Sequence, residues 1–172
     1  MIERFSVTLD INIRLCQRKD LPKLEWFGMF TDYREIILEA FERQEKGEVV
    51  MLVVEVNHFP IGQLWIDLTK HHEDSIGVLW AFRVLTPFQG MGIGSRLLAV
   101  AEKILKDKDF TIAEIGVERN DLNARQLYER VGYQVVKDNI EKWNYTTPAG
   151  KQVHETAIEW IMYQSLYSGE TP

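Results

Sequence analysis

Hydrophobic and polar residues alternate at the start of the chain. Apolar residues occupy every second position over 5–9 and again over 11–15, and this period of two predicts strands. Residues 20–46 follow a helical spacing instead and predict two short helices. Asp20 before Leu21 and Pro22 is typical of a helix N-cap with proline in the first turn.

The second of these helices has its own start and stop signals. Asp32 and Glu35 have the spacing of a capping box, in which the two side chains accept hydrogen bonds from each other's backbone. Gly47 follows the last helical position and is typical of a helix end.

Three apolar runs in the middle of the chain predict strands. Residues 49–56 form a continuous β-branched run, which fits a central strand better than a helix. After a turn at 57–60, residues 61–67 are the expected returning strand of a hairpin. Residues 76–84 form a third run of strand length after the polar loop at 71–75.

The second half of the chain alternates helices and strands. Apolar residues at helical spacing predict helices over 94–106 and 124–131, with a short strand over 111–117 between them. Residues 133–147 and 152–163 are strand-like and flank a turn.

The expected order is therefore strand, two helices, three strands, helix, strand, helix and two strands. The β-α-β-α-β arrangement near 76–136 implies some parallel pairing, whereas the 49–67 hairpin is antiparallel. The fold class is α/β in the broad sense (α+β), with a mixed central sheet of about seven strands and about four helices.

Composition limits the classes of protein. The 172 residues fit one domain spanning 1–172, and 45% hydrophobic residues suffice for a core. The net charge of −6 offers no basic face, so nucleic acid is not an expected partner. Cys16 is the only cysteine, which excludes an internal disulfide and a cysteine-based zinc site, and no metal is expected. No secretory signal and no membrane-length apolar run is visible, so we expect a cytoplasmic protein without membrane contact.

The candidate chemistry lies in residues 84–97, which leave a strand, pass three alternate glycines and enter a helix. Gly90, Gly92 and Gly94 allow a tight turn and close approach of a ligand to the backbone. A helix N-terminus offers unpaired N–H groups and partial positive charge, which suit a phosphate or pyrophosphate.

Three readings of the glycine pattern compete. A Rossmann loop needs a different glycine spacing and a position at the first strand of its domain. A P-loop needs a lysine after the glycines, and none follows here. A tight strand–helix turn without any ligand is the third reading, and it would be preferred if the glycines stood alone.

Two motifs together decide between these readings. The Gln-x-x-Gly-x-Gly of residues 89–94 resembles the acyl-CoA pyrophosphate loop of the GNAT superfamily of N-acyltransferases. The Ala-x-x-Leu-Tyr-x-x-x-Gly-Tyr of residues 124–133 resembles the second signature of that family, and residues 162–166 are similar to its last strand. The element order also matches, so the resemblance covers nearly the whole chain and implies a single GNAT domain with a GNAT fold.

The resemblance implies acetyl-CoA as the acyl donor, and it implies a set of binding residues. These are Val84, Gln89, Gly90, Met91, Gly92, Ile93, Gly94, Ser95, Asn120 and Asn123. The family usually has asparagine three residues before the alanine of the second motif, where this chain has Asp121. Both neighbouring asparagines are therefore candidates for the cofactor contact.

Acyl transfer from a thioester to an amine also needs proton-transferring groups. The resemblance makes Tyr128 the candidate catalytic residue, because a neutral phenol can protonate a departing thiolate. The competing interpretation is that Tyr128 packs in the core with Leu127 and Val131. Some relatives carry a glutamate base in the strand before the glycines, but residues 76–82 contain no acid, so no base is carried over.

Several polar and aromatic residues are further candidates. Groups that could accept the amine proton by topology, directly or through a water chain, are Asp67, Asp74, His71, His72, Glu118 and His154. The resemblance places the acceptor site beside the helical insertion and the last hairpin, where the aromatic residues are Trp26, Phe27, Phe30, Tyr33, Trp143 and Tyr145.

The expected function is transfer of an acetyl group to a primary amine, of a small molecule or of a peptide, by direct attack in a ternary complex. A non-catalytic acyl-CoA-binding sensor of the same fold is the alternative, and a longer acyl chain is a second. An exposed sheet edge would allow a homodimer, and a monomer is the equally open alternative for the oligomeric state.

Overall fold

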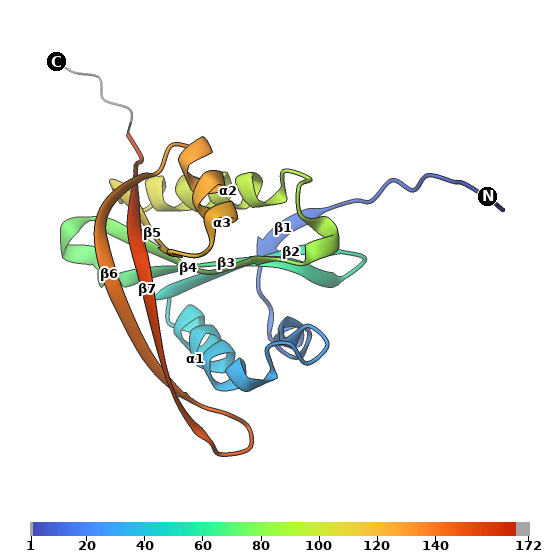
Figure 1. The fold of residues 1–172 in the computed structure, drawn as a ribbon, viewed down its shortest axis with the longest axis horizontal. Coiled ribbons are helices and arrows are strands. Elements are labelled where there is room, and N and C mark those ends of the chain that lie inside the picture. The colour runs from blue at the N-terminus through green and yellow to red at the C-terminus, as the bar shows by residue number, and fades with distance from the viewer. Residues whose placement is uncertain (1, 168–172) are drawn as a thin grey trace.

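Seven strands form one mixed sheet in the computed structural model, which describes residues 2–167 (Figure 1). The strands are β1 (Asn12–Leu15), β2 (Val49–Val56), β3 (Phe59–His71), β4 (Ile76–Val84), β5 (Ile112–Glu118), β6 (Gln134–Thr146) and β7 (Gln152–Ser165). Their order across the sheet is β1-β2-β3-β4-β5-β7-β6. Among the seven described strands, only β4 and β5 pair in parallel, so the predicted mixed sheet and antiparallel hairpin are both confirmed.

Helices cover both faces of this sheet. The α-helices are α1 (Arg34–Glu45), α2 (Ile93–Lys106) and α3 (Leu122–Arg130), and the 3-10 helices are η1 (Arg18–Glu25), η2 (Thr31–Tyr33), η3 (His72–Asp74) and η4 (Thr86–Phe88). Figure 1 shows α2 and α3 on one side of the strands and α1 on the other, with the β6–β7 hairpin extending past α1. The element order agrees with the prediction.

The two-sided burial explains the continuous apolar run of β2. Alternate side chains of a strand point to opposite faces. Leu52 and Val54 belong to the core beneath α2, whereas Met51 and Val53 belong to the core beneath α1. Both sets are at most 2% exposed, so a polar residue at any of these positions would lack a partner.

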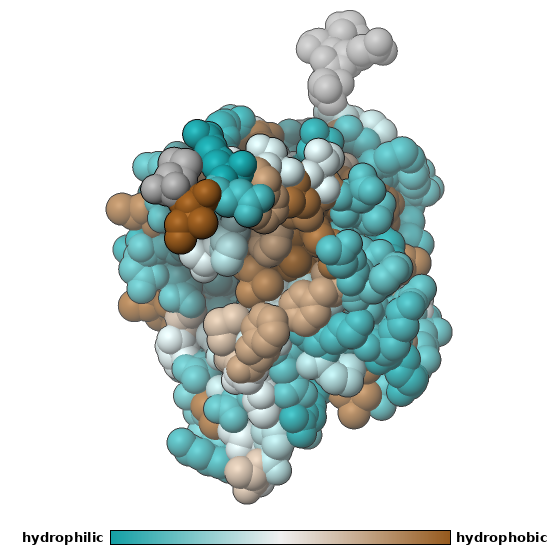
Figure 2. Space-filling model, turned by 90° about the vertical axis from the view of Figure 1, so that its right-hand side faces the viewer, coloured by the Kyte–Doolittle hydropathy of each residue, from teal (hydrophilic) through white to brown (hydrophobic). Residues whose placement is uncertain are grey.

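The strand predicted over 5–9 is wrong. This stretch has no regular structure, and its apolar side chains are exposed. The register of β1 gives the reason, because Asn12 lies opposite Glu55 and the chain of β2 ends one residue later at Val56. Residues 2–10 therefore extend past the sheet, and none of the described strands lies beside them. Figure 2 shows apolar residues gathered in a band between hydrophilic surfaces on the side of the molecule that it presents.

The predicted N-cap at Asp20 is also wrong. Asp20 lies inside η1, whose N-cap is Gln17. Its buried carboxylate accepts hydrogen bonds from Arg14 at 2.7 and 3.0 Å and from the Gln17 N–H at 2.8 Å. Arg14 also donates to Glu55 of β2, so Asp20 ties the insertion to the sheet, and its bond from the Gln17 N–H makes it the third residue of the capping box of η1 rather than the N-cap.

The capping box predicted at the next helix does not form. The helix α1 begins at Arg34, directly after η2, and no side chain caps it. Glu35 instead accepts a hydrogen bond from the Thr146 N–H at the end of β6, at 2.9 Å. The predicted stop is confirmed, because α1 ends at Glu45 and Gly47 follows with a φ of +77°.

Candidate active site

The strands β4 and β5 lie side by side for only part of their length. They pair over Ile76–Leu79 of β4 and residues 112–115 of β5, and beyond that point β4 pairs with β3 alone. A bulge begins there, with Ala81 at a φ of +50°, and the buried Gln63 side chain donates to the Ala81 carbonyl at 3.0 Å. The strands therefore separate, and one edge of the second half of β4 has no strand partner.

The loop after β4 presents free backbone N–H groups. Gly90 and Gly92 have φ values of +76° and +77°, which glycine adopts without strain, and a Cβ at either position would point into open space. The first hydrogen bond of α2 runs from the Arg96 N–H to the Gly92 carbonyl at 3.2 Å. The amides of residues 93–95 thus have no partner within the helix and suit an anionic ligand.

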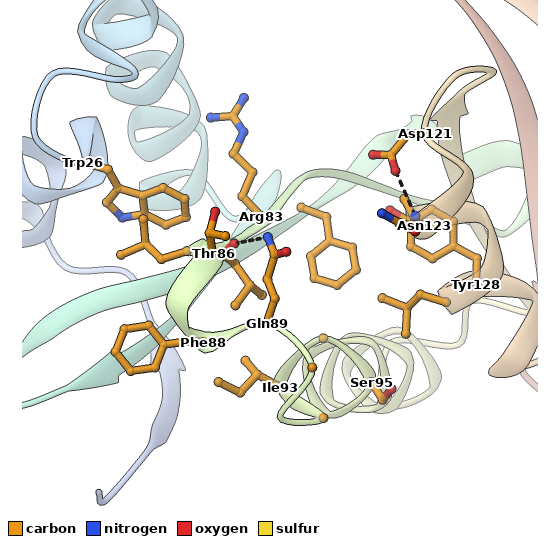
Figure 3. A pocket seen from close by; sticks show the side chains of 18 of the residues that line it. Trp26, Arg83, Thr86, Phe88, Gln89, Ile93, Ser95, Asp121, Asn123 and Tyr128 are labelled. Carbon is orange, nitrogen blue, oxygen red and sulfur yellow. Dashed lines mark hydrogen bonds between the residues drawn. The ribbon is translucent and has the colours of Figure 1, made fainter. Parts of the chain in front are cut away.

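The third glycine has a different role. A Cβ at Gly94 would lie 3.1 Å from Leu127 and 3.2 Å from Phe82, so this glycine allows close packing of α2 against α3 and β4. The Gln89 side chain donates to the Val84 carbonyl at 2.8 Å and ties the loop to the end of β4 (Figure 3). Gly94 thus lets α2 pack closely against its neighbours, and Gln89 fixes the loop relative to β4.

A cavity of about 910 Å³ lies beside this loop, between β4, α2, α3 and the insertion that carries η1 and η2. It is large enough for a sizeable ligand. The predicted site residues that line it are Val84, Gln89, Gly90, Gly92, Ile93, Gly94, Ser95, Asn123 and Tyr128. Met91 is 60% exposed and does not line this cavity. Asn120 lines a second cavity, of about 290 Å³, where β4 and β5 separate.

Asp121 begins α3 and borders both cavities. Its carboxylate accepts a hydrogen bond from the Ala124 N–H at 2.9 Å, which caps the helix. The second motif therefore uses this position to start α3, while Asn123 points toward the larger cavity and Asn120 toward the smaller one. The sequence signal for Asp121 was its place in the motif, where the family usually has asparagine.

Tyr128 is a buried side chain that also borders both cavities. Its ring lies 6.0 Å from that of Phe82, so the packing role and the cavity position coexist. Burial and the negative charge of Asp121 raise the pKa of the Tyr128 phenol above its ordinary value. The hydroxyl therefore stays protonated at neutral pH and is available as a donor.

Aromatic residues of the insertion form the opposite wall of the larger cavity. Trp26 and Phe30 line it, with ring centroids 5.5 Å apart. The Tyr33 ring centroid lies 6.1 Å from that of Phe30 and 4.9 Å from that of Tyr145 in β6, so the insertion contacts the last hairpin, but no residue of that hairpin lines either cavity. The other four predicted aromatic residues, Phe27, Tyr33, Trp143 and Tyr145, line neither cavity.

The sequence analysis missed Arg83 as a site residue. This arginine of β4 lines the larger cavity, and its guanidinium lies 4.0 Å from the ring centroid of Phe30 and 5.5 Å from that of Tyr33. Burial lowers the pKa of Arg83. The available signal was a lone charged residue within the otherwise apolar run 76–84.

None of the predicted proton acceptors lines the larger cavity. Asp67 is held by Arg43 at 2.9 Å, and His71 lies 3.3 Å from the Glu114 carboxylate. His154 contacts the Asn144 side chain at 2.6 Å. Glu118 alone among the six borders the smaller cavity.

Comparison with known proteins places this geometry in a family. The sequence profile of the acetyltransferase (GNAT) family matches residues 17–133, which span both the insertion and the two motifs. The chain belongs to the GNAT family. The predicted family and the GNAT fold are confirmed, and the family is one of acetyltransferases.

Individual GNAT relatives are distant. The chain is 31% identical over 88 residues to the aminoalkylphosphonate N-acetyltransferase of Salmonella typhimurium, over 51% of each chain. It is 26% identical over 74 residues to the uncharacterized N-acetyltransferase YycN of Bacillus subtilis, over 43% of this chain and 47% of that protein. The chain thus spans about half the length of the curated relatives it matches.

Solved GNAT structures match over most of the chain. The PaiA N-acetyltransferase of Thermoplasma acidophilum, in complex with coenzyme A, has a TM-score of 0.68 at 18% identity and covers 91% of this chain and 99% of its own. YncA of Salmonella typhimurium, with acetyl-CoA, has a TM-score of 0.69 at 16% identity and covers 94% of this chain and 97% of its own.

The helices within residues 2–167 include none with the length and hydrophobicity that a membrane span requires.

Proposed function

We propose that this chain is an acetyl-CoA-dependent N-acetyltransferase that acetylates a primary amine by direct attack in a ternary complex. The observation that carries the proposal is the larger cavity, which joins the free amides of α2 to the Tyr128 side chain and to the aromatic wall of the insertion. One cavity can thereby bring an acyl donor and an acceptor together, which is the main requirement of a direct transfer.

The residues around the loop fit coenzyme A. The amides of residues 93–95 would hold its pyrophosphate, and the open space at Gly90 and Gly92 would let the phosphates approach the backbone. Val84, Gln89, Met91 and the asparagines at 120 and 123 complete the proposed binding set. When bound, acetyl-CoA supplies an acetyl group activated as a thioester.

The residues of the chain then have separate roles. Backbone N–H groups on the free edge of β4 would polarise the acyl carbonyl. Tyr128, held neutral by burial and by the charge of Asp121, would donate a proton to the departing thiolate. Because no proton acceptor from the predicted set lines the larger cavity, we assign removal of the amine proton to water.

The one cysteine of the sequence is poorly placed to form a covalent acyl-enzyme. Cys16 packs in the core beneath α1, on the opposite face of the sheet from α2. Burial raises the pKa of its thiol to about 12, so the reactive thiolate is suppressed. Cys16 also lines neither cavity. Direct transfer is therefore the mechanism that these residues favour.

An amine panel with detection of released coenzyme A tests the proposal. The panel should contain aminoalkylphosphonates, because the Salmonella relative is named for them, together with polyamines, amino acids and peptide N-termini. We expect thiol release and a mass-verified N-acetyl product with at least one amine class. Acetyl-CoA binding without any product would support the alternative, a non-catalytic acyl-CoA-binding module.

Three further expectations belong to the same proposal. Donors of increasing acyl length would test whether acetyl is preferred over longer chains. The cytoplasmic location and the homodimer are predictions from the sequence alone. Sedimentation of the purified protein, with and without coenzyme A, would test the dimer.

A further inference from the structure

Arg83 differs from the arginines that form ion pairs in this protein. Arg14, Arg18, Arg34, Arg43, Arg119 and Arg125 each contact a carboxylate. Arg83 contacts none within residues 2–167, although it faces the larger cavity and is partly buried. A guanidinium removed from water without a partner costs free energy, so such an arrangement needs compensation.

The aromatic contacts supply part of this compensation and leave the hydrogen-bond donors free. The face of the Phe30 ring lies 4.0 Å from the guanidinium carbon, and Tyr33 lies 5.5 Å away. A guanidinium held by ring contacts keeps its N–H groups available at its edge. Those N–H groups match the paired oxygens of a carboxylate, phosphonate or phosphate.

The position of Arg83 separates it from the amides of α2. Figure 3 shows its side chain pointing away from Ile93 and Ser95, and its guanidinium lies over the ring of Phe30, which lines the cavity beside Trp26. Asp121 is the one carboxylate among the described residues that line this cavity, and it is engaged as the cap of α3. An anion at Arg83 would therefore bind apart from the pyrophosphate and beside the aromatic wall.

We propose that Arg83 binds an oxyanion of the acceptor, so that the preferred acceptor is a small primary amine that also carries a carboxylate, phosphonate or phosphate group. The inference rests on the proposed function and deepens it by naming the acceptor class. Arg83 is then a specificity-determining residue, and it holds the acceptor by the end opposite the reacting nitrogen.

Matched pairs of amines test this assignment. Each anionic member, an ω-amino carboxylate or an aminoalkylphosphonate, is compared with its neutral amide or ester at the same chain length. We expect the wild type to favour the anionic member by roughly 10–100-fold in kcat/KM, the range of a charged hydrogen bond. The carboxylate and phosphonate arms show which oxyanion fits. Equal rates for the charged and neutral members would overturn the assignment.

Substitutions of Arg83 test whether this side chain causes the preference for anionic acceptors. Arg83→Gln should remove it, and Arg83→Lys should restore part of it because the charge returns without the paired donors. Arg18→Gln is the matched control, since Arg18 also lies over an aromatic ring, 5.0 Å from Phe41, but is paired with Glu45 and lines neither cavity. A preference that survives in folded Arg83→Gln would overturn the assignment.

A binding measurement separates this inference from the proposed function. The protein loaded with coenzyme A is titrated calorimetrically with the anionic amines, for wild type and for Arg83→Gln. Binding that Arg83→Gln weakens roughly 10–100-fold supports the site even if no amine is acetylated. Acetylation of neutral amines alone would sustain the function and overturn the role of Arg83. Absence of binding by every anionic amine would also overturn it.

Discussion

Replacement of Tyr128 by phenylalanine separates its two roles, in packing and in proton transfer. The ring and its contact with Phe82 remain, and only the hydroxyl is lost. No residue within 2–167 forms a hydrogen bond with this hydroxyl, so the free energy of unfolding should change by less than about 1 kcal/mol. A positioned general acid contributes ~10²–10⁴-fold to the rate. We expect the lower end, about 2.7 kcal/mol in the activation barrier, because coenzyme A leaves readily.

The assay is single-turnover release of coenzyme A at saturating acetyl-CoA and amine, with calorimetric measurement of acetyl-CoA affinity. Tyr133→Phe is the matched control, because Tyr133 is buried 6.1 Å from the Tyr128 ring but lines neither cavity. An unchanged rate in Tyr128→Phe with a lowered melting temperature would refute proton donation and leave only packing. Weaker acetyl-CoA binding at an unchanged rate would assign the hydroxyl to cofactor positioning.

Three other predictions concern the loop, the reaction and the insertion. Gly92→Val should weaken acetyl-CoA binding measured by calorimetry, because the side chain would enter the open space beside the amides of α2. The rate at sub-saturating amine should rise with pH toward alkaline values, because the neutral amine attacks and free alkylamines have a pKa of ~10.4. Burial raises the pKa of Asp20, but hydrogen bonds from Arg14 and the Gln17 amide more than offset this and lower it. Stability from Asp20 is therefore present above the ordinary aspartate pKa and lost as pH falls below about 4, and Asp20→Asn should flatten that decline in urea titrations.

Each of these predictions has a control or a contrary result. Gly47→Val is the control for the loop, since Gly47 also has a φ of +77° and open space at its Cβ but ends α1. Equal acetyl-CoA affinity in folded Gly92→Val and wild type would remove the pyrophosphate from this loop. A rate independent of pH, with chemistry rate-limiting, would contradict attack by the neutral amine. An Asp20→Asn protein that loses stability below pH 4 as steeply as wild type would show that Asp20 does not drive the decline.

The sequence predicted best the strands that form a largely apolar run between two turns. The runs 49–56 and 76–84 match β2 and β4 residue for residue, because both are apolar and flanked by turns. The alternation over 5–9 gave a wrong prediction of a strand, because a strand also needs a neighbouring strand and β2 ends before it reaches this stretch. No local pattern reports the length of a strand that is 40 residues away.

The site shows the same division between local and remote causes. The loop from Gln89 to Ser95 could be found because its glycines, strand end and helix start are contiguous. Arg83 could not be assigned, because its aromatic neighbours come from the insertion and its free edge depends on the separation of β4 from β5. Likewise, Glu35 does not form the predicted capping box. It accepts a hydrogen bond from the Thr146 N–H instead, which is a contact between segments that are remote in the sequence.

Direct transfer is tested most directly by a single turnover in which both the protein and the amine are followed by mass spectrometry. The protein is mixed with one equivalent of acetyl-CoA, and an accepted amine is added either at once or after a delay. With direct transfer, we expect no acetylated protein before the amine is added, and N-acetyl amine equal to the released coenzyme A afterwards. Acetyl group on the protein before the amine arrives, or bound acetyl-CoA that no amine consumes, would contradict direct transfer in a ternary complex.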